Sequence, residues 1–245
     1  MKLLAWNVNH RAARRPIPPW LIRAIAAESP DVVSLTEYVV GPDHDRFLGE
    51  LANSGLLHSA LTARLNGSNQ VLVASREPLT PGAVQVATFN ENIPPNFLHV
   101  ELIETGLDVI GFRMPAYVRE ARPMKRRTWE WLIDAVRPLR EHPTVLLGDF
   151  NTAFGDPPSR CGDCLDAMIA NGWVPAVPTD GFSWRGHNGG TGRRIDLAFL
   201  SPSVKELAVS YSWAFRALGE EASAMRVGRP DHAMLLLEVT GAWAG

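Results

Sequence analysis

The sequence lacks the long apolar runs and the cysteines that mark several classes of protein. None of its apolar runs reaches the roughly 18 residues of a membrane-spanning helix, and its first residues lack the basic-then-apolar layout of a secretion signal. Only two cysteines occur among 245 residues, which excludes a disulfide framework and a zinc site of four cysteines. We therefore expect a globular, cytoplasmic protein with no membrane association.

The two cysteines, Cys161 and Cys164, stand in the spacing CGDC. Such a pair can be redox-active when it follows a strand in a thioredoxin-like unit. Here two prolines precede the pair and a helical pattern follows it, so we interpret both cysteines as part of a helical first turn.

An excess of charge of either sign is also missing. The 24 Lys plus Arg balance 26 Asp plus Glu, giving a formal charge of −2 and a pI near 6.4. This balance argues against a protein coated in basic residues for non-specific duplex binding, although it permits a local basic patch. Almost all basic residues are arginines; this suits bidentate phosphate contacts, but we interpret it as a genomic bias of composition.

Short apolar runs bounded by Asn, Gly and Pro predict a protein rich in strands. The runs between residues 56 and 112 follow one another closely and predict an antiparallel meander. The expected strands are 2–8, 31–36, 56–63, 70–75, 82–89, 97–103, 107–112, 144–147, 193–200, 206–215 and 232–239. The expected helices begin near Pro18 and Pro19 and cover 43–53, 123–140 and 164–171.

The chain has no internal repeat, no low-complexity tract and no linker, so we expect a single domain over residues 1–245. Apolar strands on both sides of the middle need cover on both faces. The predicted fold class is therefore α/β, with layers in the order helix, sheet, sheet, helix.

Polar residues recur within or at the ends of the predicted strands. They are Asn7, Glu37, Asp149, Asn151, Asp196, Asp231 and His232. A buried carboxylate is costly without a partner or a metal ion. Each residue also has a structural explanation: Glu37 or Asp196 can pair with an arginine, and His232 can be satisfied within the core. Their recurrence at strand ends predicts a shared site.

Five segments that carry these residues resemble, in order, motifs of the endonuclease/exonuclease/phosphatase superfamily, which includes pancreatic-type deoxyribonuclease and class II abasic endonucleases. The segments are LAWNVNH with Asn7, SLTEY with Glu37, GDFNT with Asp149 and Asn151, RRIDLAFLS with Asp196, and PDHAMLLLEV with Asp231 and His232. They span practically the whole chain. The resemblance implies a four-layer α/β/β/α sandwich of two mixed, largely antiparallel sheets, with the site at one edge.

The resemblance also implies a divalent metal ion, Mg²⁺ with Mn²⁺ as an alternative. Such hard ions are held by carboxylates together with substrate phosphate oxygens. Glu37 is the first ligand candidate, and the family pattern adds Asn7 and Asp231. The ion would polarise a phosphoryl oxygen and neutralise charge on the leaving oxygen.

The base that activates the attacking water has two candidates. His232 titrates near neutrality, and Asp196 can fix its tautomer and stabilise the imidazolium. Alternatively, Asp149 orients or deprotonates the water while Asn151 donates a hydrogen bond to the phosphate. The resemblance is compatible with both assignments.

The sequence departs from the family pattern in the segment GFRMPAY, where Arg113 occupies a position that usually holds histidine or tyrosine. Arginine can hold a phosphate oxygen, but it cannot give up its proton at ordinary pH. Tyr117 or a metal-bound water can replace the missing acid. Alternatively, Arg113 only pairs with Glu37 or another acid.

Arginine-rich segments beside the site strands predict contacts with a polyanion. The substrate-binding candidates are Arg15, Arg119, Arg126, Arg127, Arg194 and Trp184. Each cluster alone can be a solvated loop surface, and Trp184 can stack on a base or pack in the core. Taken together, the clusters favour a phosphate-rich substrate.

These residues predict a metal-dependent phosphodiester hydrolase, a nuclease acting on DNA by in-line attack of an activated water on a metal-bound phosphate. Two alternatives stay open. The first is a phosphatase or phosphodiesterase of a small phosphorylated metabolite or signalling nucleotide, which the near-neutral pI tolerates. The second is an inactive relative that binds nucleic acid or a protein, which Arg113 motivates. No obligate protein partner is evident.

Overall fold

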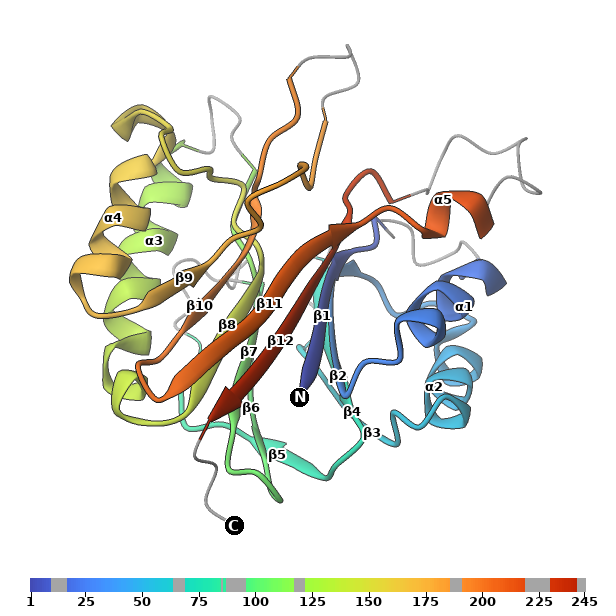
Figure 1. Cartoon of the computed structure of the whole chain (residues 1–245). Coiled ribbons are helices and arrows are strands. Elements are labelled where there is room, and N and C mark those ends of the chain that lie inside the picture. Colours follow the sequence, from blue (N-terminus) through green and yellow to red (C-terminus); the bar gives the residue numbers. More distant parts are fainter. Residues whose placement is uncertain are drawn as a thin grey trace.

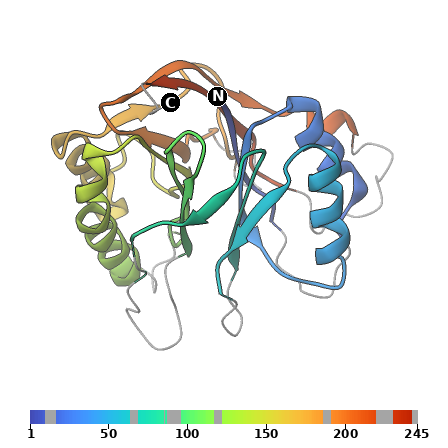
Figure 2. The ribbon, with the colours of Figure 1, turned by 90° about the horizontal axis from the view of Figure 1, so that it is seen from below.

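The chain forms two six-stranded sheets that pack face to face, with helices on their outer faces (Figures 1 and 2). A computed structural model describes residues 1–9, 17–63, 69–84, 86, 96–116, 122–185, 191–218 and 230–241. The four layers run helix, sheet, sheet, helix, as Figure 2 shows from below, and this confirms the predicted fold class. No helix in the described part of the chain combines the length and the hydropathy needed to cross a bilayer.

The first sheet has the strand order β11-β12-β1-β2-β4-β3. Its strands are β1 (Lys2–Asn7), β2 (Val32–Tyr38), β3 (His58–Leu61), β4 (Gln70–Ser75), β11 (Val204–Ser212) and β12 (Met234–Gly241). The strands β1 and β2 pair in parallel, and the other neighbours are antiparallel. The helices beside this sheet are α1 (Pro19–Glu28), α2 (His44–Asn53) and the short α5 (Phe215–Leu218).

The second sheet has the order β5-β6-β7-β8-β10-β9. Its strands are β5 (Leu79–Pro81), β6 (Asn96–Leu102), β7 (Asp108–Arg113), β8 (Thr144–Asp149), β9 (Val174–Ala176) and β10 (Asp196–Leu200). Only β7 and β8 pair in parallel. Its outer face carries α3 (Arg122–Val136), α4 (Gly162–Ala170) and the 3-10 turns η2 (Arg137–Glu141) and η3 (Pro158–Arg160).

The two sheets meet over a core of aliphatic side chains from both inner faces. Gly111, within β7, marks a point of close approach. A Cβ atom there would lie 2.5 Å from Oγ of Ser34 and 2.8 Å from Cγ1 of Val71, both in the opposite sheet. The close contact requires glycine and fixes the spacing of the sheets near the site.

Most predicted elements are present, and the differences have physical reasons. The predicted meander is divided between the sheets, because β3 and β4 join the first sheet while β6 and β7 join the second. The structure describes residues 82–84 and 86 of the strand expected at 82–89, and none of these lies in a strand, so the prediction is wrong there; the other four residues lie outside the described part. The elements β5, β9 and α5 were not predicted, since three or four residues are too few to show a period.

The interpretation of the two cysteines is confirmed. Cys161 caps α4 and Cys164 lies in the first turn of that helix. Both side chains are buried, and neither forms a disulfide. They belong to the apolar contact between α4 and the second sheet.

Candidate active site

The directions of the strands bring distant polar residues to one edge of the two sheets. Asn7 and Asp149 are the last residues of β1 and β8, and Arg113 is the last residue of β7. Asp196 begins β10 and lies directly opposite Asp149 in the antiparallel pair of these strands. Together with the short segment before β12, which carries His232, these strand ends form one buried polar cluster.

Asn7 connects the two sheets through its side-chain amide. Its Nδ2 donates to Oε1 of Glu37 at 3.2 Å and to Oδ2 of Asp149 at 3.0 Å. Its Oδ1 accepts the backbone N–H of Asn9 at 3.0 Å, which turns the amide nitrogen toward the carboxylates. The resulting bridge holds a carboxylate of the first sheet beside a carboxylate of the second.

Arg113 brings a positive charge to both of these carboxylates. Its Nη2 donates to Oε1 of Glu37 at 2.6 Å, and its Nε lies 3.8 Å from Oδ2 of Asp149 without a hydrogen-bond partner among the described residues. The ion pair considered as the alternative role of Arg113 is therefore present. Glu37 itself has φ of 54°, in the left-handed region that non-glycine residues rarely adopt.

Asp149 is held in place by the turn that follows its strand. Its Oδ1 accepts the backbone N–H of Asn151, and its Oδ2 accepts Nδ2 of Asn151, both at 2.9 Å. The same Nδ2 donates to the carbonyl of Met114 at 2.9 Å. Burial raises the pKa of Asp149 to about 6; the nearby Asp196 acts in the same direction, and His232 opposes it.

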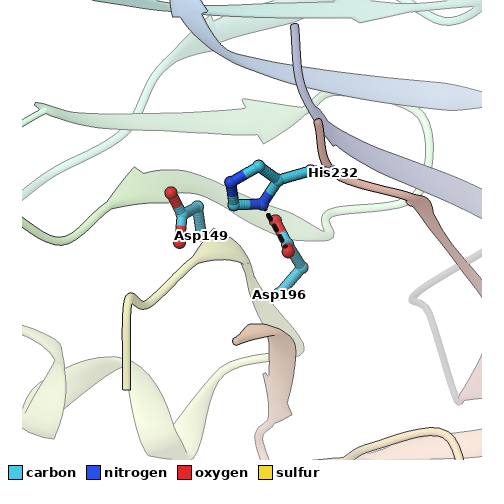
Figure 3. A group of neighbouring side chains, drawn as sticks. All are labelled: Asp149, Asp196 and His232. Carbon is cyan, nitrogen blue, oxygen red and sulfur yellow. Dashed lines mark hydrogen bonds and ion pairs between the residues drawn. The ribbon is translucent and has the colours of Figure 1, made fainter. Parts of the chain in front are cut away.

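His232 and Asp196 form a buried pair. Nδ1 of His232 lies 2.8 Å from Oδ2 of Asp196, and Asp149 lies on the other side of the imidazole ring (Figure 3). Metal-ligating atoms of the three residues all lie within 4.8 Å of one another. Burial alone would lower the pKa of His232, but the charges of Asp196 and Asp149 outweigh it and raise that pKa to about 9. The ring is therefore an imidazolium at neutral pH.

Two residues that the sequence did not reveal hold this pair. Nε1 of Trp6 donates to the carbonyl of His232 at 3.1 Å. Oγ of Ser183 accepts the backbone N–H groups of Ile195 and Asp196, each at 3.0 Å. The position of Trp6 next to Asn7 in the motif LAWNVNH is the only signal that pointed to it, and no pattern singles out Ser183.

Lys125 belongs to one of the basic segments that predicted contacts with a polyanion, but its buried position was not predicted. Its side chain is buried, and its Nζ donates to the backbone carbonyl of Asn151 at 2.7 Å. Burial lowers the pKa of Lys125 to about 8, although the charge of the nearby Asp156 opposes this effect. A signal existed: Lys125 stands four residues before Trp129, on the stripe of the helix that faces the core.

Asp231 contacts the predicted aromatic residue, Trp184. Its Oδ2 accepts Nε1 of Trp184 at 3.2 Å, and both residues are half-buried. The backbone of Trp184 also forms bridges with His232 and Arg193. Trp184 thus lies beside the site, and stacking on a base stays a prediction.

The predicted substrate arginines are dispersed. Arg126 donates to both carboxylate oxygens of Asp163, at 2.8 and 3.0 Å, and so joins α3 to α4. Arg194 donates to the carbonyls of Thr179 and Gly181. Arg127 is exposed on α3. Three further predicted site residues lie outside the described residues: Arg15, Arg119 and Tyr117.

The donor atoms of the cluster suit a hard divalent cation. Three buried carboxylates, those of Glu37, Asp149 and Asp196, are balanced by one guanidinium and one imidazolium. Carboxylate oxygens are the ligands that Mg²⁺ prefers in proteins. Asn7 presents its amide nitrogen to the carboxylates, so it would have to rotate before its oxygen could join such a set.

Comparisons with known proteins agree with the fold and with the family resemblance. The sequence profile of the Endonuclease/Exonuclease/phosphatase family matches residues 4–224. Among curated proteins, none matches the sequence significantly.

Several solved structures share the fold. An endonuclease/exonuclease/phosphatase from Beutenbergia cavernae has a TM-score of 0.73 and 20% identity, over 98% of this chain and 71% of that chain. The 3′ phosphatase NExo from Neisseria, bound to a product DNA hairpin, has a TM-score of 0.68 and 22% identity, over 98% and 99%. The 3′-5′ exonuclease NExo from Neisseria meningitidis has a TM-score of 0.67 and 21% identity, over 97% of this chain and 99% of that chain.

Proposed function

The chain belongs to the endonuclease/exonuclease/phosphatase family, and we propose that it is a phosphodiester hydrolase that requires a divalent metal ion and acts on DNA. The observation that carries the proposal is the hydrogen-bonded cluster of buried carboxylates at the sheet edge, with the His232–Asp196 pair beside Asp149. Concentrated buried charge is unfavourable for folding and is typical of sites that perform chemistry. The DNA hairpin bound by the similar structure of NExo supports DNA as the substrate class.

We propose Glu37 as the principal ligand of Mg²⁺ or Mn²⁺. Asp231 and a rotated Asn7 are the further ligand candidates, since both supply oxygen atoms. When bound, the ion would polarise the phosphoryl oxygens and neutralise charge on the leaving oxygen. Arg113 shares the carboxylate of Glu37 and therefore adds a fixed positive charge beside the phosphate.

Asp149 is the proposed base for the attacking water. With a pKa of about 6 it is ionised at neutral pH, yet it is a stronger base than an ordinary carboxylate. Asn151 keeps the carboxylate oriented, because both hydrogens of its amide are engaged by Asp149 and by the carbonyl of Met114. In this assignment Asn151 acts on the phosphate only indirectly.

His232 is the proposed electrostatic partner of the phosphate. Because Asp196 holds Nδ1, the other ring nitrogen is the one that donates to a substrate oxygen. A pKa of about 9 keeps the ring protonated, so it stabilises negative charge and does not act as the base. Arg113 cannot supply the proton of the leaving group, and Tyr117 stays a candidate for that role.

The test is hydrolysis of single-stranded, duplex, nicked and abasic DNA by purified protein with Mg²⁺, Mn²⁺ or a chelator. We expect metal-dependent cleavage of at least one DNA, abolished in Asp149→Asn and retained in Asp134→Asn, a control at an exposed carboxylate of α3. Cleavage of none of them would overturn DNA as the substrate. Phosphate release from a panel of phosphorylated metabolites would then support the small-molecule alternative, and binding of DNA without turnover would support an inactive relative.

A further inference from the structure

Two arginines beside the site stack on neighbouring aromatic rings. Cζ of Arg185 lies 4.5 Å from the centroid of the Phe182 ring, and Cζ of Arg216 lies 3.8 Å from the centroid of Trp213. The centroids of these two rings are 5.6 Å apart. The guanidiniums come from segments more than twenty residues apart in the chain, the loop before β10 and the helix α5.

The aromatic platform below them is continuous with the support of His232. Nε1 of Trp213 donates to the carbonyl of Phe182 at 3.2 Å, which ties the two segments together. Trp213 also packs on Phe215, and Phe215 packs on Trp6, whose Nε1 donates to the carbonyl of His232. The platform is therefore a structural extension of the site.

Neither guanidinium has a carboxylate partner among the described residues, although Arg113, Arg126 and Arg193 each have one. Both side chains are exposed. Partial burial lowers the pKa of Arg216, and the charge of Arg185 lowers it further, so the two cations act on each other. Two neighbouring positive charges that have no carboxylate partner in the described part of the chain are satisfied best by an anion that contacts both.

Stacking prepares these arginines for an oxyanion. A guanidinium held flat on a ring keeps its N–H groups in one plane, and this fork matches the oxygens of a phosphate. An exposed arginine without such support samples many rotamers before it binds. The arrangement is therefore partly preorganised for phosphate.

The position of the pair relative to the reaction centre limits which phosphate it can bind. Arg185 directly follows Trp184, and Nε1 of Trp184 donates to Asp231. Arg185 is therefore the sequence neighbour of a residue that contacts the site, and its guanidinium stacks on Phe182. A phosphate held over the Phe182 and Trp213 rings would be a second phosphate, beside the one cleaved at the ends of β8 and β10.

We propose that Arg185 and Arg216 form a second phosphate-binding site, which holds the phosphate of a neighbouring nucleotide while another phosphate is cleaved. This inference rests on the proposed function and extends it, because it favours a polynucleotide over a substrate with one phosphate. In this proposal, Arg185 and Arg216 recognise the nucleic acid, and the buried residues at the sheet edge perform the hydrolysis.

The experiment compares a substrate that can occupy both sites with one that can occupy only the reaction centre. The probes are a fluorescein-labelled oligonucleotide of about 12 nucleotides and bis(p-nitrophenyl) phosphate, each measured with Mg²⁺ or Mn²⁺. The variants are R185A, R216A, the double variant R185A/R216A, and R185Q/R216Q, which keeps a polar side chain that can donate hydrogen bonds but removes the charge. R137A is the control, since Arg137 is an exposed arginine paired with Asp134 on the α3 side.

We expect the ratio of kcat/KM for the oligonucleotide to that for the small diester to fall about tenfold or more in both double variants. Oligonucleotide binding in a chelator, followed by fluorescence anisotropy, should weaken in parallel, with a slope of log K against log salt that is shallower by about one. R137A should resemble the wild type in both measurements.

The outcomes separate this inference from the proposed function. If the wild type cleaves both substrates and the two double variants keep its ratio and its oligonucleotide affinity, the second site is refuted while the hydrolase stands. If the wild type cleaves neither substrate with either metal, the hydrolase is refuted, and metal-free binding still decides the second site: an unchanged affinity rejects it and a weakened one supports it.

Discussion

Nη2 of Arg113 donates to Oε1 of Glu37 at 2.6 Å, across the interface between the two sheets. Both side chains are largely buried, with exposed fractions of 15% for Arg113 and 4% for Glu37. The residue that departs from the family pattern is thus bound directly to the carboxylate proposed as a metal ligand. In the absence of a metal ion, the guanidinium of Arg113 neutralises Glu37. The stability of the metal-free protein therefore depends on Arg113.

Replacing Arg113 by glutamine should lower the free energy of unfolding of the metal-free protein by about 3 kcal/mol, because a buried carboxylate loses its cation. Mg²⁺ should then raise the melting temperature of R113Q more than that of the wild type. The ion binds only the folded state, and in the variant it also neutralises the buried carboxylate of Glu37, which has lost its cation. Urea unfolding in a chelator and thermal unfolding with increasing Mg²⁺ measure these effects.

The control for this variant is R137Q, which removes an exposed ion pair with Asp134. Such pairs contribute about 0–1 kcal/mol, so its unfolding should change little with or without Mg²⁺. Equal responses of R113Q and R137Q to Mg²⁺ would show that Glu37 does not bind the ion.

The His232–Asp196 pair should make the stability of the metal-free protein depend on pH. The pKa of His232 is about 9 in the folded state and about 6.5 in the unfolded chain, so the folded state binds the proton more tightly. The pair therefore contributes stability that is fully present below about pH 6.5 and is lost as the pH rises through 9. Urea unfolding between these limits should show this loss in the wild type.

Asp196→Asn supplies the matching control. The variant keeps the shape of the side chain and removes the charge that raises the pKa of His232, so its stability should fall much less over the same pH range. Parallel curves for the wild type and the variant would contradict the assignment of the proton to His232.

The meeting of several candidate site residues could be predicted from the sequence because they lie at the ends of strongly apolar strands. Asn7, Asp149 and Asp196 interrupt or end such runs, and the directions of the strands bring them together. The layer order followed from the same runs, since strands that are apolar on both faces need cover on both sides. The local sequence pattern was therefore sufficient to predict those features of the fold that depend on which residues are buried.

Contacts between segments distant in the chain could not be predicted in this way. The bond from Lys125 to Asn151 and the stack of Arg216 on Trp213 depend on how α3 and α5 pack on their sheets. The division of the meander between two sheets likewise depends on tertiary pairing, because the runs on either side of β5 have the same local pattern. An amide that turns its nitrogen inward, as in Asn7, has no sequence signal.

The closeness of the sheets at Gly111 predicts a large effect of a small substitution. In Gly111→Ala the new Cβ would meet Oγ of Ser34 at 2.5 Å and Cγ1 of Val71 at 2.8 Å, so the sheets must shift apart. We expect a loss of about 1–3 kcal/mol in the free energy of unfolding. Gly49→Ala is the control: nothing lies within 4 Å of its Cβ on α2, and alanine there should add about 0.5–1 kcal/mol.

Lys125 should affect activity through Asn151. Its Nζ holds the carbonyl of Asn151, whose amide in turn orients Asp149, and Asn151 keeps an unfavourable φ of 49°. In Lys125→Met the apolar packing is retained and the hydrogen bond is lost, so kcat should fall about tenfold while KM changes little. Lys125→Arg keeps the charge and a donor, and it should recover part of kcat. Steady-state kinetics on the best DNA substrate measure both variants; equal kcat values for Lys125→Met and the wild type would show that the carbonyl of Asn151 needs no fixed donor.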